Sequence, residues 1–196
     1  MSISQFLNSS GFTMFEGHSQ NFLKQVEDLI NLSNGPNINV MEIGFNAGHS
    51  AEVFLSSNPS LSLTSFDLCI YDCVLPAKNF IDVTYPNRHT LILGDSTVTV
   101  PKYIIDNPDK KFDIIFIDGG HDYTTANADL KNCRRLANED TIVILDDTVY
   151  THGWEQPYTV GPTKAWVEHI NNGEIKEINR VEYDVGRGMS WGKYLF

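Results

Sequence analysis

A short apolar run followed by two glycines constrains the fold of this chain more than any other feature. Residues 39–50 read N-V-M-E-I-G-F-N-A-G-H-S, so the apolar run leads directly to Gly44 and Gly48. This pattern predicts a buried strand, a glycine turn and a helix at residues 50–55. Such a turn lets a ligand approach the backbone and directs the free N–H groups of the helix at it. Glu42 adds a carboxylate at the strand end, on the rim of that crevice, which favours a cationic or neutral ligand group there over a pyrophosphate.

Apolar strands and helices alternate along the chain. The predicted strands are residues 39–43, 61–66, 89–93, 112–117 and 141–145, and the predicted helices are residues 21–32, 50–55, 72–82, 97–107, 123–136 and 162–170. Continuous apolar strands between helices are typical of a parallel sheet that is covered on both faces. Residues 175–183 and 189–196 read as an antiparallel hairpin at the sheet edge. The expected fold class is therefore α/β.

Length and charge narrow the class of protein. The 196 residues, 41% of them hydrophobic, suit one domain over residues 1–196, with residues 1–18 as an N-terminal arm or as a flap over a site. The formal net charge of −11 argues against nucleic acid and anionic membrane surfaces as partners. The chain has no apolar stretch of about 18 residues and no signal-peptide pattern, so we expect a soluble, cytoplasmic protein. Its three cysteines lack the paired spacing of a zinc site.

Carboxylates follow the ends of the predicted parallel strands. They are Glu42, Asp67, Asp95, Asp118, Asp146 and Asp147. Ligands of parallel sheets bind outside the carboxyl ends of the strands, and an acid about 20 residues after the glycine turn accepts hydrogen bonds from ribose hydroxyls. One such carboxylate is more often a helix cap, but six along one rim are hard to explain as caps. A nucleoside with a positive tail fits Glu42 and Asp67 together.

The most specific pattern joins I-F-I-D-G-G-H-D-Y at residues 115–123 to I-L-D-D-T at residues 144–148. Asp118, Asp146 and Asp147 supply hard oxygen ligands from adjacent strand ends, which suits Mg²⁺. An imidazole three residues after Asp118 could take a proton from a substrate hydroxyl. On the residues alone, helix caps and a solvated turn histidine stay open as alternatives.

Residues 149–160 contain too many aromatic side chains for a plain linker. Aromatic faces stack well on sugar rings and phenols. We therefore expect Tyr150, Trp154 and Tyr158 to shape an acceptor pocket, with His152 in the same loop.

These motifs resemble the class I S-adenosylmethionine-dependent methyltransferases, and more narrowly the metal-dependent O-methyltransferases that act on catechols, caffeoyl-CoA and macrolide sugars. The resemblance rests on E-I-G-F-N-A-G, the strand that ends at Asp67, G-D-S at residues 94–96 and the two aspartate motifs, and it runs from about Glu16 to the C-terminus. It implies a Rossmann-like, doubly wound, seven-stranded sheet, mostly parallel, and a segment E-G-H-S-Q-N-F-L, starting at Glu16, that helps to cover the cofactor. It also implies a set of cofactor-binding residues. These are Glu42, Gly44, Phe45, Asn46, Gly48, His49, Ser50, Asp67, Asp95, Ser96 and Asp118.

The same resemblance places Asp118, Asp146 and Asp147 at the metal-ligand positions and gives Asp118 and His121 catalytic roles. Two departures from the phenol-methylating members stand out: His121 replaces their lysine base, and Asp146-Asp147 replaces Asp-Asn. Both departures move the sequence toward the sugar-methylating members. A sugar hydroxyl is much less acidic than a phenol, so it needs a base as the methyl group transfers.

We therefore expect an O-methyltransferase that methylates a hydroxyl of a sugar or glycan, with His121 as general base and a divalent metal, Mg²⁺, in support. Three alternatives stay open. One is a phenol or catechol methyltransferase, and another is a non-catalytic S-adenosylmethionine-binding module. The third, an NAD-dependent enzyme, is disfavoured because the turn reads G-F-N-A-G-H and not G-x-G-x-x-G. A homo-oligomer and a place within a larger glycan-building protein also stay open.

Overall fold

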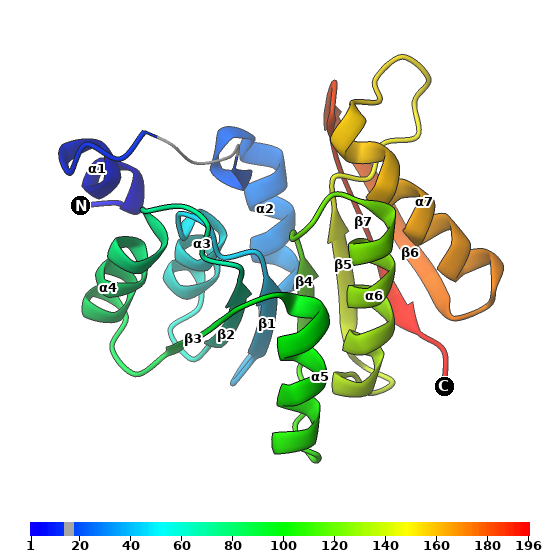
Figure 1. Ribbon diagram of the computed structural model, residues 1–196, viewed down its shortest axis with the longest axis horizontal. Coiled ribbons are helices and arrows are strands. Elements are labelled where there is room, and N and C mark those ends of the chain that lie inside the picture. Colours follow the sequence, from blue (N-terminus) through cyan, green and yellow to red (C-terminus); the bar gives the residue numbers. More distant parts are fainter. Residues whose placement is uncertain (14–17) are drawn as a thin grey trace. The chain divides into compact units, whose positions relative to one another are not determined.

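The computed structural model describes residues 1–13 and 18–196, which form two compact units, Met1–Asp95 and Ser96–Phe196 (Figure 1). The single domain expected over residues 1–196 stays a prediction. The expected N-terminal arm includes residues 14–17, which lie outside the described residues, as does the Glu16 at which the family resemblance begins. Within the described ranges, no helix has the length and apolar character needed to span a membrane.

The first unit alternates helices and strands. Its elements are α1 (Ile3–Ser9), a 3-10 turn η1 (Ser19–Asn21), α2 (Leu23–Leu32), β1 (Asn39–Ile43), α3 (His49–Ser57), β2 (Ser62–Asp67), α4 (Val74–Thr84) and β3 (His89–Leu93). The three strands pair in parallel in the order β3-β2-β1, with Asn39 opposite Ser62 and Leu63 opposite His89. The apolar side chains of β1 are buried. The strand, turn and helix predicted around Gly44 and Gly48 are thus confirmed.

Helix α1 lies in the segment predicted to be an arm. Ser2 and Gln5 form a capping box at its start, and the side chains of Ile3 and Leu7 are fully buried. The Ile3 N–H donates a hydrogen bond of 2.7 Å to Glu52 of α3. The beginning of the chain is therefore a helix that packs on α3 and α4 of its own unit.

The second unit carries the other four strands. Its elements are α5 (Ser96–Asp106), β4 (Ile114–Ile117), α6 (Tyr123–Cys133), a 3-10 turn η2 (Arg134–Leu136), β5 (Ile142–Asp146), α7 (Pro157–Asn171), β6 (Ile175–Asp184) and β7 (Arg187–Tyr194). Strand β4 pairs with β5 in parallel, and β7 pairs antiparallel with both β5 and β6. The C-terminal hairpin and its place at the sheet edge are confirmed. The fold is therefore α/β with a seven-stranded, mostly parallel sheet that ends in an antiparallel hairpin, as predicted.

One predicted boundary is wrong. Helix α7 was expected from residue 162, but it begins at Pro157. Proline suits the first turn of a helix because its missing N–H has no partner there, and Gln156 and Thr159 cap the end with reciprocal hydrogen bonds. Tyr158 therefore lies in the first turn of a helix and not in an irregular aromatic loop.

Candidate active site

The glycine turn of the first unit has the backbone that its sequence predicts. Gly44, Asn46 and Gly48 have positive φ angles of 97°, 45° and 77°. A Cβ atom on Gly48 would lie 3.1 Å from the ring of Phe45, so the turn is close-packed on its inner side. The Phe45 side chain is itself buried, which leaves its backbone as the part that a ligand could approach.

Asp67, predicted to hold a ribose, closes the turn from β2. One carboxylate oxygen accepts the Asn46 N–H at 2.7 Å, and the other accepts the Cys69 N–H at 2.6 Å. Since each carboxylate oxygen has two lone pairs, both oxygens keep acceptor capacity for a ligand. Asp67 therefore fixes the turn and can still receive a hydroxyl.

Glu42 does not lie on an open rim, which corrects its predicted position. Its side chain is fully buried, and its two oxygens accept hydrogen bonds from Ser50 at 2.5 Å and Ser65 at 2.6 Å. Burial raises the pKa of Glu42 to about 7, against the two serine hydrogen bonds, which lower it, while the charge of Asp67 raises it further. Glu42 and Ser50 thus form a buried polar cluster beneath the turn, because β1 places residue 42 on the inside of the unit.

His49 begins α3 and is also buried. Its ring stacks on that of His18 with 3.5 Å between ring centroids. Burial, and after it the charge of His18, lower the pKa of His49 to about 3, so the imidazole is neutral near pH 7. Asp95 is exposed just after β3, and Ser96, half-buried, is the first residue of α5 in the second unit.

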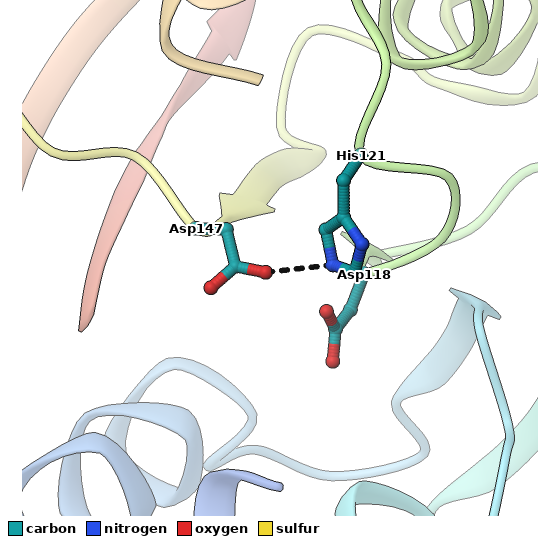
Figure 2. A group of neighbouring side chains, drawn as sticks. All are labelled: Asp118, His121 and Asp147. Atoms are coloured by element: carbon teal, nitrogen blue, oxygen red, sulfur yellow. Dashed lines mark ion pairs between the residues drawn. The ribbon is translucent and has the colours of Figure 1, made fainter. Parts of the chain in front are cut away.

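A second group of side chains lies within the second unit. Asp118 follows β4, His121 lies in the turn before α6, and Asp147 follows β5 (Figure 2). One ligand atom from each lies within 4.8 Å of the other two. His121 Nε2 lies 2.8 Å from Asp147 Oδ2, and Asp147 is almost fully buried, whereas His121 is partly exposed. Two of the three predicted metal ligands, Asp118 and Asp147, thus lie together with His121, the residue predicted to act as the base.

Asp146, one of the three predicted metal ligands, is not a member of this group within the described residues. Its Oδ1 accepts the N–H of Asp147 at 3.0 Å. That bond accompanies a φ of +55° at Asp147, in the left-handed region that non-glycine residues seldom adopt. Asp146 therefore holds the backbone that aims Asp147 at His121.

Arg187, which the sequence analysis did not single out, adds a cation to the group. Its Nη1 lies 3.4 Å from Asp147 Oδ1, and its side chain is mostly buried. Burial lowers the pKa of Arg187, but the carboxylates of Asp146, Asp147 and Asp118 outweigh it and raise the pKa overall. No local motif marks this arginine, because its partner lies 40 residues earlier in the sequence.

The turn that carries His121 is held by α6 and α7. Asp122 caps α6 by accepting the N–H of Thr125. Gly161 of α7 packs directly on the turn, since a Cβ atom there would lie 2.3 Å from the His121 carbonyl oxygen and 2.6 Å from the Tyr123 nitrogen. Only glycine permits this approach. The Tyr158 ring meets His121 edge-on, with 5.8 Å between ring centroids.

The residues of the aromatic segment differ in their partners and their exposure. The Tyr158 hydroxyl donates to the Gly186 carbonyl at 3.2 Å, and the Trp154 carbonyl accepts the Gly186 N–H at 2.8 Å. Tyr150 lies under the Arg180 guanidinium and contributes to a hollow of about 780 Å³ along α7. His152 is fully exposed. Of the four predicted acceptor-pocket residues, Tyr158 is the one that the structure places in contact with His121.

The donor set of this second group suits a divalent cation. Asp118 and Asp147 supply hard carboxylate oxygens, and the imidazole of His121 lies beside them. The carboxylates of Asp118, Asp146 and Asp147 outnumber the one guanidinium, that of Arg187, so the charge around the site is negative. On chemistry and charge, therefore, the residues fit such an ion.

The family of the chain follows from comparison with known proteins. Residues 41–148, more than half of the chain, match the family model described as "Methyltransferase domain". The chain belongs to this family, which confirms the resemblance to methyltransferases. No curated protein sequence gives a significant match.

Solved structures agree with the fold over nearly the whole chain. Cofactor-bound Rv0187 from MTB has a TM-score of 0.76 at 15% identity, covering 98% of this chain and 87% of that one. An O-methyltransferase from Bacillus cereus in complex with SAH has a TM-score of 0.72 at 14% identity, covering 98% and 89%. CalS11, a TDP-rhamnose 3'-O-methyltransferase of calicheamicin biosynthesis, has a TM-score of 0.66 at 17% identity, covering 97% and 86%. At these identities, the similarity establishes the fold.

Proposed function

We propose that this methyltransferase uses S-adenosylmethionine to methylate a hydroxyl group of a sugar or glycan. The observation that carries the proposal is the His121–Asp147 pair in a chain of the methyltransferase family. Membership of the methyltransferase family supports a methyl group as the group transferred. The His121–Asp147 pair supplies a base for a hydroxyl acceptor.

The first unit supplies the cofactor site. S-adenosylmethionine, when bound, provides an electrophilic methyl group on a sulfonium centre. The open backbone at Gly44 and Asn46 admits the ligand, and the Asp67 carboxylate accepts the ribose hydroxyls. Glu42 and Ser50 lie beneath the turn and complement the positive methionine end. Asp95, the last residue of this unit, borders the adenine.

His121 is the general base in this proposal. A carboxylate only accepts hydrogen bonds, so the imidazole nitrogen that faces Asp147 carries the hydrogen, and the lone pair belongs to the other ring nitrogen, Nδ1. Asp147 then stabilises the imidazolium that forms as the hydroxyl proton is taken, as a carboxylate partner does in other imidazole bases. The base acts during methyl transfer, because a sugar hydroxyl is not ionised beforehand near neutral pH.

A divalent metal, Mg²⁺ by preference, belongs to the same proposal. Asp118 and Asp147 would hold it, with Asp146 fixing the backbone of Asp147. The chemistry that such an ion would supply there is polarisation of an acceptor hydroxyl, which would lower the cost of its deprotonation.

Three features support a sugar acceptor. The proposed base is a histidine, and one structural neighbour, CalS11, is a TDP-rhamnose 3'-O-methyltransferase. Tyr158, against His121, offers a ring on which a sugar could stack. The expected cytoplasmic location and the possibilities of a homo-oligomer or a larger glycan-building protein stay predictions.

Transfer of a labelled methyl group tests the proposal. The protein is incubated with methyl-tritiated S-adenosylmethionine, Mg²⁺ and a panel of nucleotide sugars, free sugars and catechols. Label should pass to a sugar hydroxyl, and His121→Gln should slow this transfer strongly. Transfer to catechols alone would favour the phenol-methylating alternative. Cofactor binding without transfer to any member of a broad panel would favour the non-catalytic module.

A further inference from the structure

Arg187 is an unusual neighbour for a cation site. Its side chain is only 14% exposed, and its Nη1 lies 3.4 Å from one oxygen of Asp147, whose other oxygen lies 2.8 Å from His121. Both oxygens of the most buried carboxylate in the group therefore already have a positively charged or hydrogen-donating partner.

The backbone fixes this arrangement. Gly188 lies against Thr148, whose N–H donates to the Gly188 carbonyl at 3.1 Å, and a Cβ atom on Gly188 would lie 2.2 Å from the Thr148 carbonyl oxygen. Strands β5 and β7 are antiparallel with Asp146 opposite Met189, so Asp147 and Arg187 lie one and two residues beyond this pair, at the same end of the two strands. The long arginine side chain spans the remaining offset to Asp147, and its direction is what can change.

A guanidinium and a divalent cation compete for the same carboxylate. Both are attracted to Asp147, and the arginine charge repels an ion held by Asp118 and Asp147 across a few ångströms of partly buried space. We infer that Arg187 is the residue that sets the affinity of this site for divalent cations: it holds Asp147 when no ion is bound and must turn away from it when one binds. This inference rests on the metal site of the proposed function.

Titration of the whole protein with Mn²⁺ alone tests the inference. Isothermal titration compares the wild type with Arg187→Met, which removes the charge, and Arg187→Lys, which keeps it. Lys193→Met is the matched control, because Lys193 lies on the same strand but pairs with the exposed Asp140. Arg187→Met should bind Mn²⁺ at least about tenfold more tightly than the wild type. Arg187→Lys and Lys193→Met should stay within about threefold of it.

If Arg187→Met does not fold, a second measurement, made on the wild type, still tests the inference. The side-chain nitrogen resonance of Arg187, assigned by its disappearance in Arg187→Lys, should move as Mg²⁺ is added, and that of Arg180 should not.

Unchanged or weaker Mn²⁺ binding in Arg187→Met, or an unmoved Arg187 resonance in protein that binds Mg²⁺, would overturn the inference and leave the proposed function intact. Absence of Mn²⁺ binding in every variant would overturn both the inference and the proposed metal. Labelled methyl transfer that persists in EDTA would then show that the methyltransferase proposal survives without the metal.

Discussion

His121 Nε2 lies 2.8 Å from Asp147 Oδ2, although the two residues follow different strands of the second unit. The contact joins a partly exposed imidazole to a nearly buried carboxylate. In the proposed function, a base that is oriented in this way needs no reorganisation when it takes a proton, which is the condition for efficient general-base catalysis.

Substitution of His121 by Ala should lower turnover about 10²- to 10⁴-fold, the usual contribution of a general base. The affinity for S-adenosylmethionine should not change, because the proposed cofactor residues from Glu42 to Asp95 lie in the first unit, whereas His121 lies in the second. Single-turnover rates and isothermal titration measure the two quantities separately. Equal turnover in the variant would rule out His121 as the base.

Two substitutions of Asp147 test its charge beside His121 and the backbone strain at residue 147. Asp147→Asn should fold normally, because asparagine also tolerates the positive φ of +55°, but it should lower turnover by loss of the charge that stabilises the imidazolium. Asp147→Ala should in addition lose roughly 1 kcal/mol of unfolding free energy, because alanine is strained at this φ. Urea unfolding of both variants measures the difference. Equal stabilities would contradict the strain at residue 147.

Gly161→Ala should disturb the His121 turn from a distance. The added Cβ would lie 2.3 Å from the His121 carbonyl oxygen, so helix α7 or the turn must shift. The cost of such overpacking, about 1–3 kcal/mol, exceeds the helix propensity gained by replacing glycine. We expect lower stability and lower turnover, measured by thermal unfolding and methyl transfer. Val160→Ala, at an exposed neighbouring position, is the control that should retain both.

Glu42 makes the stability of the protein depend on pH. Folding raises the pKa of this buried carboxyl from 4.5 to about 7, so between these values the unfolded chain is ionised while the folded protein still holds the proton. The free energy of unfolding should therefore fall as the pH rises through this window, by up to about 3 kcal/mol from this group. Urea unfolding at pH 5, 6, 7 and 8 should show this fall in the wild type. The contribution should be missing in Glu42→Gln, and parallel pH profiles of the two proteins would refute it.

The sequence predicts the central elements well because their signals are local. The apolar run of β1 and the glycines that follow it are read directly, and the hairpin of β6 and β7 is marked by the turn between two strand-like segments.

Two local signals were missed. The proline at the first helical position marks the start of α7 at Pro157, but the aromatic residues around it suggested a loop. The capping box of Ser2 and Gln5 likewise marks the start of α1, in a segment that was predicted to be an arm.

The parts that could not be predicted depend on contacts between distant residues. Arg187 is placed beside Asp147 by strand pairing, and no pattern in D-V-G-R-G indicates it. The burial of Glu42 depends on Ser65 of the neighbouring strand, which accommodates the carboxyl inside the unit. Asp146 and Asp147 are adjacent in sequence, yet only the second joins His121, because the positive φ at residue 147 directs the two side chains differently.

The most direct test of the central claim is isothermal titration of the folded wild-type protein with S-adenosylmethionine, with NAD as the comparison ligand. The proposed function predicts saturable binding of S-adenosylmethionine with one site per chain and no binding of NAD. Folded protein that binds NAD, or that binds neither compound, would contradict the proposed methyl transfer and return the glycine turn to a purely structural role.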